Sequence, residues 1–496
     1  MEHVDVVVVG AGISGIGAAY FLQRECADRS FVILEGRADI GGTWDLFRYP
    51  GVRSDSDMHT LGYSFKPWTA ERAIADGPSI MAYLRETVAE FGIARHIRFQ
   101  HLVQTASWDG AAARWTVRGT NAASGDAVAL TCNFLFMCSG YYSYRHGHTP
   151  DFAGREDFAG TIAHPQQWPE DLDYRRKRVA VIGSGATAMT VVPAMAGEAA
   201  HVTMIQRSPT YVVARPDRDA IANRLRRILP DRAAYAITRF KNVHLQQFVY
   251  RRTRTRPETV KRVLLREVRR ALGPDYDVDR HFTPSYNPWD QRLCLIPNGD
   301  LFKAIKSGKV DVVTGHIDRF SAGGVRLVSG EEVAADIIVT ATGLELVTLG
   351  EVAFDVDGAP VDFSKTWTYK GLAYSDVPNL ASTFGYINAS WTLRADLTCR
   401  FVCRLLNHMR QTGTDTCTPR LRPSDRDMTA RPWVDDFSAG YVERVAHLLP
   451  KQGDRAPWVN PQHYATDKRL LLRDPLSDGV MQFSGHQSLR VARPVG

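Results

Sequence analysis

Two stretches of the chain share one pattern, which is a short apolar run, a glycine-rich turn and then apolar residues at helical spacing. The first reads V-D-V-V-V-V-G-A-G-I-S-G over residues 4–15, and its helical pattern continues to about Cys26 before a second apolar run at 31–35. The other reads R-V-A-V-I-G-S-G-A-T-A over residues 178–188, with a further apolar run at 201–206. Uninterrupted apolar runs are typical of strands buried on both faces of a parallel sheet. The pattern therefore predicts two βαβ units.

Two later apolar runs, at 134–140 and 336–343, end in small residues and are expected at the far side of each nucleotide-binding domain. The uncharged runs 6–23 and 179–197 each contain several glycines, so we interpret them as a strand, a turn and a helix start, not as membrane spans. The pattern predicts an α/β fold with two Rossmann-like dinucleotide-binding domains, the second inserted in the first. The expected divisions are residues 1–148 for the first part of the first domain, 149–324 for the second domain, and 325–496 for the rest of the first domain with a C-terminal segment.

Basic residues are concentrated in one part of the chain. The sequence contains 61 Lys and Arg residues against 54 Asp and Glu residues, for a net charge of +7. Residues 216–290 alone contain 17 basic and nine acidic residues, so the remainder is close to neutral. This distribution argues against a protein that binds nucleic acid over its whole surface. Residues 216–290 are expected to form a helical insertion within the second domain.

Part of the basic segment has an apolar helical face, formed by Val260, Leu264, Val268 and Leu272, while basic residues cover the other faces. One interpretation is an amphipathic helix that packs on the protein and exposes its basic side. The other is an interfacial helix that makes peripheral contact with anionic lipid. The first is favoured, because such stripes usually mark contacts with the core.

The seven cysteines are odd in number, widely spaced and free of any C-x-x-C pair. This pattern argues against a disulfide framework and against a zinc site, and it favours a reducing, cytoplasmic compartment. Cys399 and Cys403 are four residues apart, which fits one buried stripe of a helix better than a redox pair. The N-terminus shows no signal-peptide pattern.

The first glycine-rich turn contains a dinucleotide-binding fingerprint. Gly10, Gly12 and Gly15 form G-x-G-x-x-G between a predicted strand and a predicted helix, and Glu35 ends the next strand. The first glycine permits a tight turn, the second lets the backbone approach a pyrophosphate, and the third lets helix and strand pack closely. Phosphates would lie at the helix N-terminus, and Glu35 would accept hydrogen bonds from an adenosine ribose. This site is predicted to bind FAD.

The second turn contains Gly183, Gly185 and Ala188, but no acidic residue follows its second strand; Arg207 stands there instead. An arginine can bind the 2′-phosphate that an acid would repel, so the site is predicted to prefer NADPH to NADH. The alternative is that Arg207 is only a solvated residue at a strand end. Two such sites indicate an electron path from NADPH to flavin. A disulfide reductase would need paired redox cysteines, so O2 is the natural acceptor.

Residues 158–169 contain F-x-G-x-x-x-H-x-x-x-W-P, residues 41–55 read G-G-T-W-D-L-F-R-Y-P-G-V-R-S-D, and residues 336–343 end in A-T-G. These three segments resemble marker segments of the class B flavin monooxygenases of the Baeyer–Villiger type. Trp168 matches the tryptophan that this family has in the marker segment, whereas the related N- and S-oxygenating enzymes usually have tyrosine at that place. The resemblance extends from about residue 4 to about residue 480. It is greatest to the branch that includes the ethionamide-activating monooxygenases.

The resemblance implies that Arg292, in N-P-W-D-Q-R-L-C, is the active-site arginine and that Asp55 pairs with it. In the implied reaction NADPH reduces FAD, and O2 then gives a C4a-peroxyflavin. A fixed guanidinium would stabilise this anion and the oxyanion formed on addition to a carbonyl. Spacing alone would favour a turn-capping role for Asp55 and a surface salt bridge for Arg292. The expected cofactor-binding residues are Gly10, Gly12, Ser14, Gly15, Glu35, Gly42, Thr43, Trp44, Asp45, Leu46, Arg53, Ser54, Asp55, Val103, Gly183, Ser184, Gly185, Ala186, Thr187, Ala188, Gln206 and Arg207.

The expected activity is that of an NADPH- and O2-dependent FAD monooxygenase that converts ketones to esters or lactones and also S-oxygenates sulfides or thioamides. One alternative is an enzyme limited to N- or S-oxygenation, and another is an NADPH-dependent flavin reductase that oxygenates nothing. The substrate pocket is expected near residues 287–296 and 388–393. His164 is expected to form hydrogen bonds at a hinge between the domains and not to act as a general base. No nucleic-acid partner is expected, and the sequence leaves homo-oligomer formation open.

Overall fold

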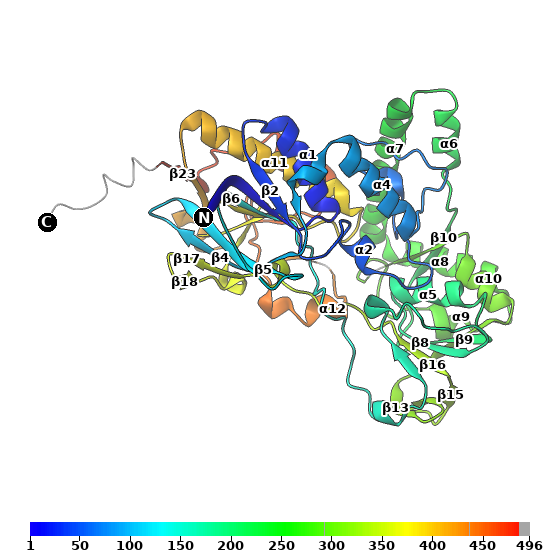
Figure 1. Ribbon diagram of the computed structural model, residues 1–496. Coiled ribbons are helices and arrows are strands. Elements are labelled where there is room, and N and C mark those ends of the chain that lie inside the picture. Colours follow the sequence, from blue (N-terminus) through cyan, green and yellow to red (C-terminus); the bar gives the residue numbers. More distant parts are fainter. Residues whose placement is uncertain (292, 436, 486–496) are drawn as a thin grey trace.

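The computed structural model describes residues 1–291, 293–435 and 437–485, and it contains two units, each built on a largely parallel sheet (Figure 1). The N-terminal strands and helices, in blue and cyan, lie together with the C-terminal elements in one unit. The segments in green form most of the other unit. The second unit is thus inserted in the first, as the sequence predicts. No helix within the described ranges is long and apolar enough to cross a bilayer.

The first unit contains a nine-stranded sheet among the described residues. β1 (Glu2–Val9) lies between β6 (Ala127–Met137) and β2 (Phe31–Leu34), and both pairings are parallel. The valines of β1 are almost completely buried, because its neighbours and the helices cover both faces. The remaining strands are β3 (Ile97–Arg98) beyond β2, then β5 (Arg114–Asn121), β4 (His101–Asp109), β17 (Ala353–Val356) and β18 (Ala359–Pro360) beyond β6, with β21 (Leu380–Ser382) paired to the end of β6.

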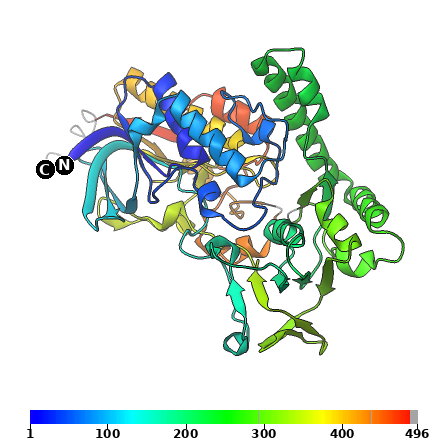
Figure 2. The ribbon, with the colours of Figure 1, turned by 45° about the vertical axis from the view of Figure 1, so that its right-hand side comes forward.

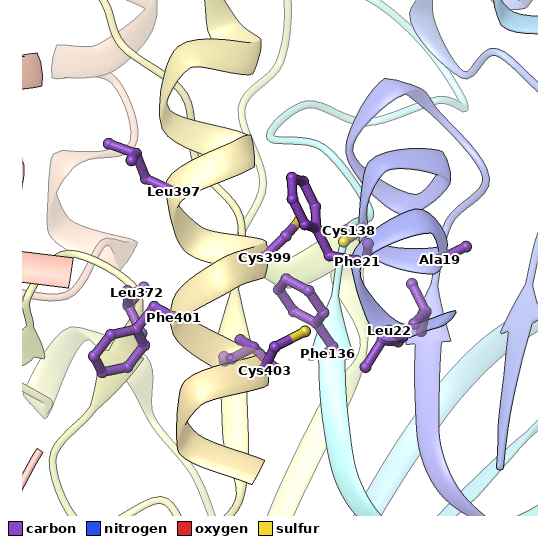
Figure 3. Close-up of a cluster of buried hydrophobic side chains, with 14 of the residues drawn as sticks. Ala19, Phe21, Leu22, Phe136, Cys138, Leu372, Leu397, Cys399, Phe401 and Cys403 are labelled. Carbon is purple, nitrogen blue, oxygen red and sulfur yellow. The ribbon is translucent and has the colours of Figure 1, made fainter. Parts of the chain in front are cut away.

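One face of this sheet is covered by α1 (Ile13–Glu25), α4 (Gly77–Glu90) and α11 (Trp391–Thr412), whose apolar residues form one core cluster. Figure 3 shows Cys399 and Cys403 on the side of α11 that faces Phe21 and Leu22 of α1. All seven cysteines are buried and free of disulfides. The prediction that Cys399 and Cys403 belong to a buried helical stripe is confirmed.

The second unit contains a parallel sheet in the order β12, β9, β8, β16, β7. Its strands are β7 (Thr161–Ala163), β8 (Arg178–Ile182), β9 (His201–Gln206), β12 (Val310–Thr314) and β16 (Ile337–Thr340). The helix α5 (Ala186–Met195) connects β8 to β9 and completes the predicted βαβ unit. Two smaller sheets lie beside it, formed by β10 (Val212–Arg215) with β11 (Cys294–Pro297), and by β13 (Ile317–Ser321), β14 (Gly324–Leu327) and β15 (Glu332–Ala334).

The pairing of β16 corrects one expected boundary. The division between residues 324 and 325 falls inside the second unit, because β16 pairs in parallel with both β8 and β7. β16 takes the same place beside β8 that β6 takes beside β1. The chain returns to the first sheet only at β17, which pairs with β4. The physical reason is that an apolar run buried on both faces needs a central place in a sheet.

The basic insertion is helical, as predicted, and comprises α6 (Ala220–Arg226), α7 (Asp231–Thr255), α8 (Pro257–Leu272) and α9 (Val278–Phe282). On α8 the residues Leu264, Val268 and Leu272 are buried, and the last two belong to the core of the second unit. The packed amphipathic helix is therefore the correct interpretation of α8. The hairpin of α6 and α7 projects beyond the rest of the molecule (Figure 2).

The remaining helices and strands are short. They are α2 (Thr43–Leu46), α3 (Met58–Leu61), α10 (Asp300–Lys306), α12 (Gly440–Glu443), α13 (Tyr464–Leu472), β19 (Thr368–Tyr369), β20 (Ala373–Tyr374), β22 (Thr416–Pro419) and β23 (Met481–Ser484).

Candidate active site

A large cleft connects the two units. It extends from the carboxyl ends of β1, β2 and β6 in the first sheet to the start of α5 and to β10 in the second unit. Ligands of open parallel sheets bind at the carboxyl ends of the strands. The cleft has a volume of about 1340 Å³, whereas pockets for a single small ligand measure roughly 300–1,000 Å³. It therefore has room for more than one ligand.

The β1–α1 turn has the geometry that its glycines predict. Gly10 has a φ of +102°, and a Cβ there would lie 2.6 Å from the carbonyl oxygen of Cys138. A Cβ on Gly15 would lie 1.8 Å from the Gly10 oxygen, so only glycine lets α1 pack this closely on the strand. The N-cap of α1 is Gly12, so the helix has no side-chain cap, and its first turn contains no acidic residue. Its first N–H groups are thus available to a phosphate anion.

Glu35 lies at the end of β2, buried at the wall of the cleft. Its carboxylate accepts hydrogen bonds from the backbone N–H groups of Ala11 (2.7 Å) and Arg37 (2.8 Å). Burial raises the pKa of Glu35, while these two donors act in the opposite direction. A carboxylate has about four acceptor positions, so two remain for the hydroxyls of a ribose. These observations fit the adenosine end of a dinucleotide.

The segment after Ile40 follows the cleft wall for only part of its length. Gly42, Thr43 and Trp44 line the cleft, and the hydroxyls of Thr43 and Tyr142 lie 2.7 Å apart. Asp45 and Leu46 do not line it. The carboxylate of Asp45 is buried and binds the guanidinium groups of Arg37 and Arg48, each at 2.6 Å. Its contacts in this structure are therefore structural.

Three cofactor candidates follow on one loop. Arg53, Ser54 and Asp55 all line the cleft. Arg53 Nη1 lies 2.5 Å from Asp300 Oδ2 on α10, and its Nη2 donates to the Met189 carbonyl oxygen of α5 at 3.3 Å. Ser54 is buried, and its hydroxyl accepts from the Ala75 N–H. The carboxylate-bearing Asp55 is exposed in the cleft.

Arg292 lies outside the described residues, so its pairing with Asp55 stays a prediction. Its neighbours Leu293 and Leu295, together with Trp289, line the same cleft as Asp55. The residues Asn388, Ala389, Ser390 and Trp391 line it as well. Both segments expected near the substrate therefore reach one cavity. Val103, on β4, lines the cleft as well.

The second fingerprint repeats the geometry of the first. Gly183 has a φ of +136°, and a Cβ there would lie 2.3 Å from the carbonyl oxygen of Ala341, just beyond β16. The N-cap of α5 is Gly185, so the helix has no side-chain cap, and a Cβ on Gly185 would have no neighbour within 4 Å. Ala186 and Thr187 at its first turn line the cleft. The turn is thus open on the side from which a pyrophosphate would approach.

The other residues expected here have different surroundings. The Ser184 hydroxyl donates to the Ser208 carbonyl oxygen, and Ala188 is buried in the core. Gln206 is buried, and its amide donates to the His281 carbonyl oxygen at 2.7 Å. Arg207 follows β9 and is exposed, but it is not among the residues that line the cleft.

The sequence reasoning missed several residues of the cleft. Arg215 at the end of β10, and Arg218 just after it, line the second unit's side. Tyr49 is buried beside Thr187, and burial raises the pKa of its phenol to about 12. Trp391, which belongs to the segment expected near the substrate, donates from Nε1 to the Ser14 hydroxyl at 2.8 Å and so joins α11 to the first glycine turn. The excess of arginine after Val213 was a signal for the first two, but only as part of a longer basic segment.

His164 lies where the two connections between the units run together. These connections form an antiparallel bridge between Tyr142 and Leu346. A Cβ on Gly147 would lie 2.0 Å from Cε1 of His164, so the ring packs directly on the first connection. Burial lowers the pKa of His164, and the nearby backbones of Gly343 and His148 act in the opposite direction. This position supports the hinge role expected for His164.

Two Rossmann-type units that meet at one cleft define a protein that binds two dinucleotides. The model of the flavin-binding monooxygenase-like family matches residues 3–253. The chain belongs to this family. It is therefore an FAD-containing monooxygenase, an oxidoreductase that uses FAD and NADPH with O2 and small-molecule substrates.

Similar proteins cover nearly the whole chain. The FAD-containing monooxygenase EthA of Mycobacterium tuberculosis (strain ATCC 25618 / H37Rv) is 55% identical over 484 residues, which is 97% of this chain and 98% of EthA. The probable FAD-binding monooxygenase AlmA of Acinetobacter baylyi is 46% identical over 483 residues, 97% of this chain and 96% of AlmA. A solved structure of oxidized steroid monooxygenase bound to NADP has a TM-score of 0.77 at 22% identity and covers 97% of this chain and 99% of its own. That likeness shows the fold.

Proposed function

We propose that this monooxygenase inserts one oxygen atom of O2 beside the carbonyl carbon of a ketone, giving an ester or lactone. Sulfides and thioamides would be a second class of substrate. One observation carries the proposal: the loop with Asp55 and the segments on either side of Arg292 line the same cleft as the first glycine turn and the first turn of α5. A carbonyl bound there would be close to a carboxylate, a guanidinium and the flavin end of the cofactor. FAD, reduced by NADPH, supplies the activated oxygen.

The residues of the chain supply position and charge. Arg292 would donate hydrogen bonds to the carbonyl oxygen of the ketone as negative charge develops on it, and Asp55 would hold the guanidinium in place. Arg53, bound to Asp300, would fix the Asp55 loop against the second unit. One oxygen atom enters the product between two carbons, the other leaves as water, and two electrons come from NADPH.

The apolar part of the substrate has a matching environment. A smaller cavity adjoins the cleft and shares Tyr141, Tyr386 and Trp391 with it. It continues to Trp433 and Phe437, and its wall is mainly apolar. Apolar walls favour the transfer of apolar groups from water. The cavity has a volume of about 50 Å³, so it suits a short hydrocarbon group of a ketone or sulfide.

Product analysis tests the proposal. The FAD-loaded enzyme is given NADPH, isotopically labelled O2, and a panel of linear, cyclic and aryl ketones with one thioether. We expect esters or lactones with one labelled oxygen atom. Sulfoxide from the thioether with no ester from any ketone would favour the S-oxygenating alternative. Oxidation of NADPH with hydrogen peroxide as the only product would identify a flavin reductase.

A further inference from the structure

The α6–α7 hairpin exposes an unusual number of apolar side chains. Of the twelve large hydrophobic residues that are exposed within the described ranges, six lie between residues 221 and 248. Ile228 is 71% exposed and Phe240 is 67% exposed. We call these six the apolar stripe: Ile221, Ile228, Ile237, Phe240, Leu245 and Phe248. Exposed apolar residues that gather in one place mark an interaction surface.

Part of the stripe follows one side of α7. Ile237, Phe240 and Phe248 recur at intervals of three and eight residues, which keeps them on one face of a helix. The buried residues of α7, among them Tyr235, Thr238 and Asn242, lie on the opposite side. The contacts of α7 with the rest of the protein therefore use its other face and leave Ile237, Phe240 and Phe248 exposed to solvent.

The same hairpin is strongly basic. Residues 220–255 contain nine Arg and Lys residues and one acidic residue, Asp231. Three of these cations bind carboxylates elsewhere in the protein, namely Lys241, Arg239 and Arg254. The exposed arginines without a carboxylate partner in the described part of the chain are Arg224, Arg227, Arg232, Arg251 and Arg252. The guanidinium of Arg252 lies 5.1 Å from the centre of the Phe248 ring, so charge and apolar surface are adjacent.

We propose that the α6–α7 hairpin docks on an anionic lipid bilayer. The stripe would enter the boundary between headgroups and acyl chains, while the arginines bind lipid phosphates. A second copy of this chain fits poorly, because two hairpins of high positive charge would repel each other. Nucleic acid would use the arginines but would leave the isoleucines and phenylalanines in water. A bilayer accounts for both features of the surface.

The position of the stripe relative to the cleft gives this docking a consequence. Ile221 and Leu245 belong to the stripe and also line the cleft, together with Gln246 and Val249 of α7. Docking would place this opening against the lipid. An apolar substrate dissolved in the bilayer could then enter the cleft without crossing water. This second step rests on the proposed function, whereas the docking itself does not.

Vesicle sedimentation tests the docking. The FAD-loaded full chain is mixed with vesicles of phosphatidylcholine alone, or of phosphatidylcholine containing phosphatidylglycerol, at low and high salt. We expect binding to the anionic vesicles that weakens as salt is raised. The double variant Phe240→Ser/Phe248→Ser should bind at least about tenfold more weakly. The double variant Arg251→Gln/Arg252→Gln should lose roughly tenfold in affinity for anionic vesicles.

The matched control is Val328→Ser, which removes an equally exposed apolar side chain (69%) from a turn outside the hairpin. It should bind like the parent, and all variants should keep the parent's melting temperature and flavin content. Equal sedimentation with both kinds of vesicle would overturn the proposal, and so would unchanged binding by the phenylalanine variant. The surface would instead belong to an interface between two copies of the chain if the parent forms a dimer and does not bind vesicles, while the phenylalanine variant is a monomer.

Substrate entry is tested separately with a long-chain ketone held in anionic vesicles and a short, water-soluble ketone. We expect vesicles to lower the apparent KM for the long ketone in the parent but not in Phe240→Ser/Phe248→Ser, with the short ketone unaffected in both. Equal KM values for the long ketone would overturn entry from the bilayer. Failure to oxygenate either ketone would instead count against the proposed function.

Discussion

The guanidinium of Arg53 lies 2.5 Å from the carboxylate of Asp300, and this ion pair joins the two units at the cleft. Arg53 belongs to the loop that contains Asp55, and Asp300 begins α10 of the second unit. Both side chains are largely shielded from water, with 16% and 29% exposed. The pair therefore fixes the loop of the first unit relative to the unit that contains the second glycine turn.

Asp300→Asn should release Arg53 without unfolding the protein. Ion pairs of this kind near a surface contribute about 1 kcal/mol or less to stability, so the melting temperature should change little. Because Asp300 does not itself line the cleft, effects on NADPH must pass through Arg53. We expect a higher KM for NADPH and slower flavin reduction in stopped-flow absorbance. The control Asp318→Asn, on β13, should behave like the parent; identical reduction kinetics in Asp300→Asn would show that the pair has no part in positioning.

Two glycines of the second turn should respond differently to the same substitution. Gly183→Ala would place a Cβ 2.3 Å from the Ala341 oxygen at a positive φ, and we expect a loss of stability of roughly 1–3 kcal/mol. Gly185→Ala meets no neighbour within 4 Å, so its melting temperature should equal the parent's. It should nevertheless raise the KM for NADPH, because the methyl group would occupy the side where a pyrophosphate approaches. Parent-like NADPH kinetics in Gly185→Ala would contradict this placement.

Glu35→Gln should weaken FAD binding and alter the pH dependence of stability. An amide has one acceptor oxygen and would set its NH2 group against the N–H of Ala11 or Arg37, so we expect less FAD per protein after purification. Burial raises the pKa of Glu35 above its usual value of 4.5 in the folded protein. At a pH above this raised pKa, ionised Glu35 therefore lowers the free energy of unfolding. The loss disappears when the carboxyl is protonated.

This effect of Glu35 on stability is measured on the protein without FAD. Relative to Glu35→Gln, the parent should lose stability as the pH rises from about 4.5 through the raised pKa, and the difference should then stay constant. Denaturant unfolding of both apoproteins across this range measures the difference. A parent that gains stability relative to the variant over the same interval would show that the two N–H donors outweigh burial.

Arg207→Ala should distinguish the two nicotinamide cofactors. Arg207 is exposed beyond the end of β9, where a 2′-phosphate would approach the second turn. A charge-assisted contact with that phosphate would be lost for NADPH only. We expect the KM for NADPH to rise by roughly tenfold or more, with little change for NADH. Equal changes in KM for both cofactors would leave Arg215 and Arg218 as the better candidates for binding the 2′-phosphate.

The βαβ units could be predicted because their signal is local. A valine run, three glycines and an acid or arginine at a fixed distance lie within about thirty residues, and backbone sterics determine the turn. The insertion of one unit in the other was also predictable from the repeat. The boundary between the two units after residue 324 could not be predicted, because β16 has no local feature that determines which of the two sheets it joins. Its place depends on pairing with β8 and β7, which are far away in sequence.

The candidate site shows the same division. Glu35 and Gly10 follow from spacing, whereas Asp300 and Arg215 reach the cleft region through tertiary packing that no motif encodes. Asp45 belongs to a marker segment, yet its carboxylate binds Arg37 and Arg48. A residue within a marker segment is therefore expected to contact the cofactor only when its side chain is not already bound to other side chains of the protein. The apolar stripe on the α6–α7 hairpin could likewise not be distinguished from an ordinary amphipathic pattern before the burial of its residues was known.

The most direct test of the account is the fate of electrons from NADPH in Arg292→Ala. The parent should form ester in proportion to the NADPH it oxidises. The variant should still bind FAD and oxidise NADPH, but its ester formation should fall about a hundredfold or more, with hydrogen peroxide in its place. Arg292→Lys should recover little, because an ammonium lacks the fork of donors, and the exposed Arg118→Ala should match the parent. Conversion of ketone to ester by Arg292→Ala at near the parent rate would contradict the central assignment.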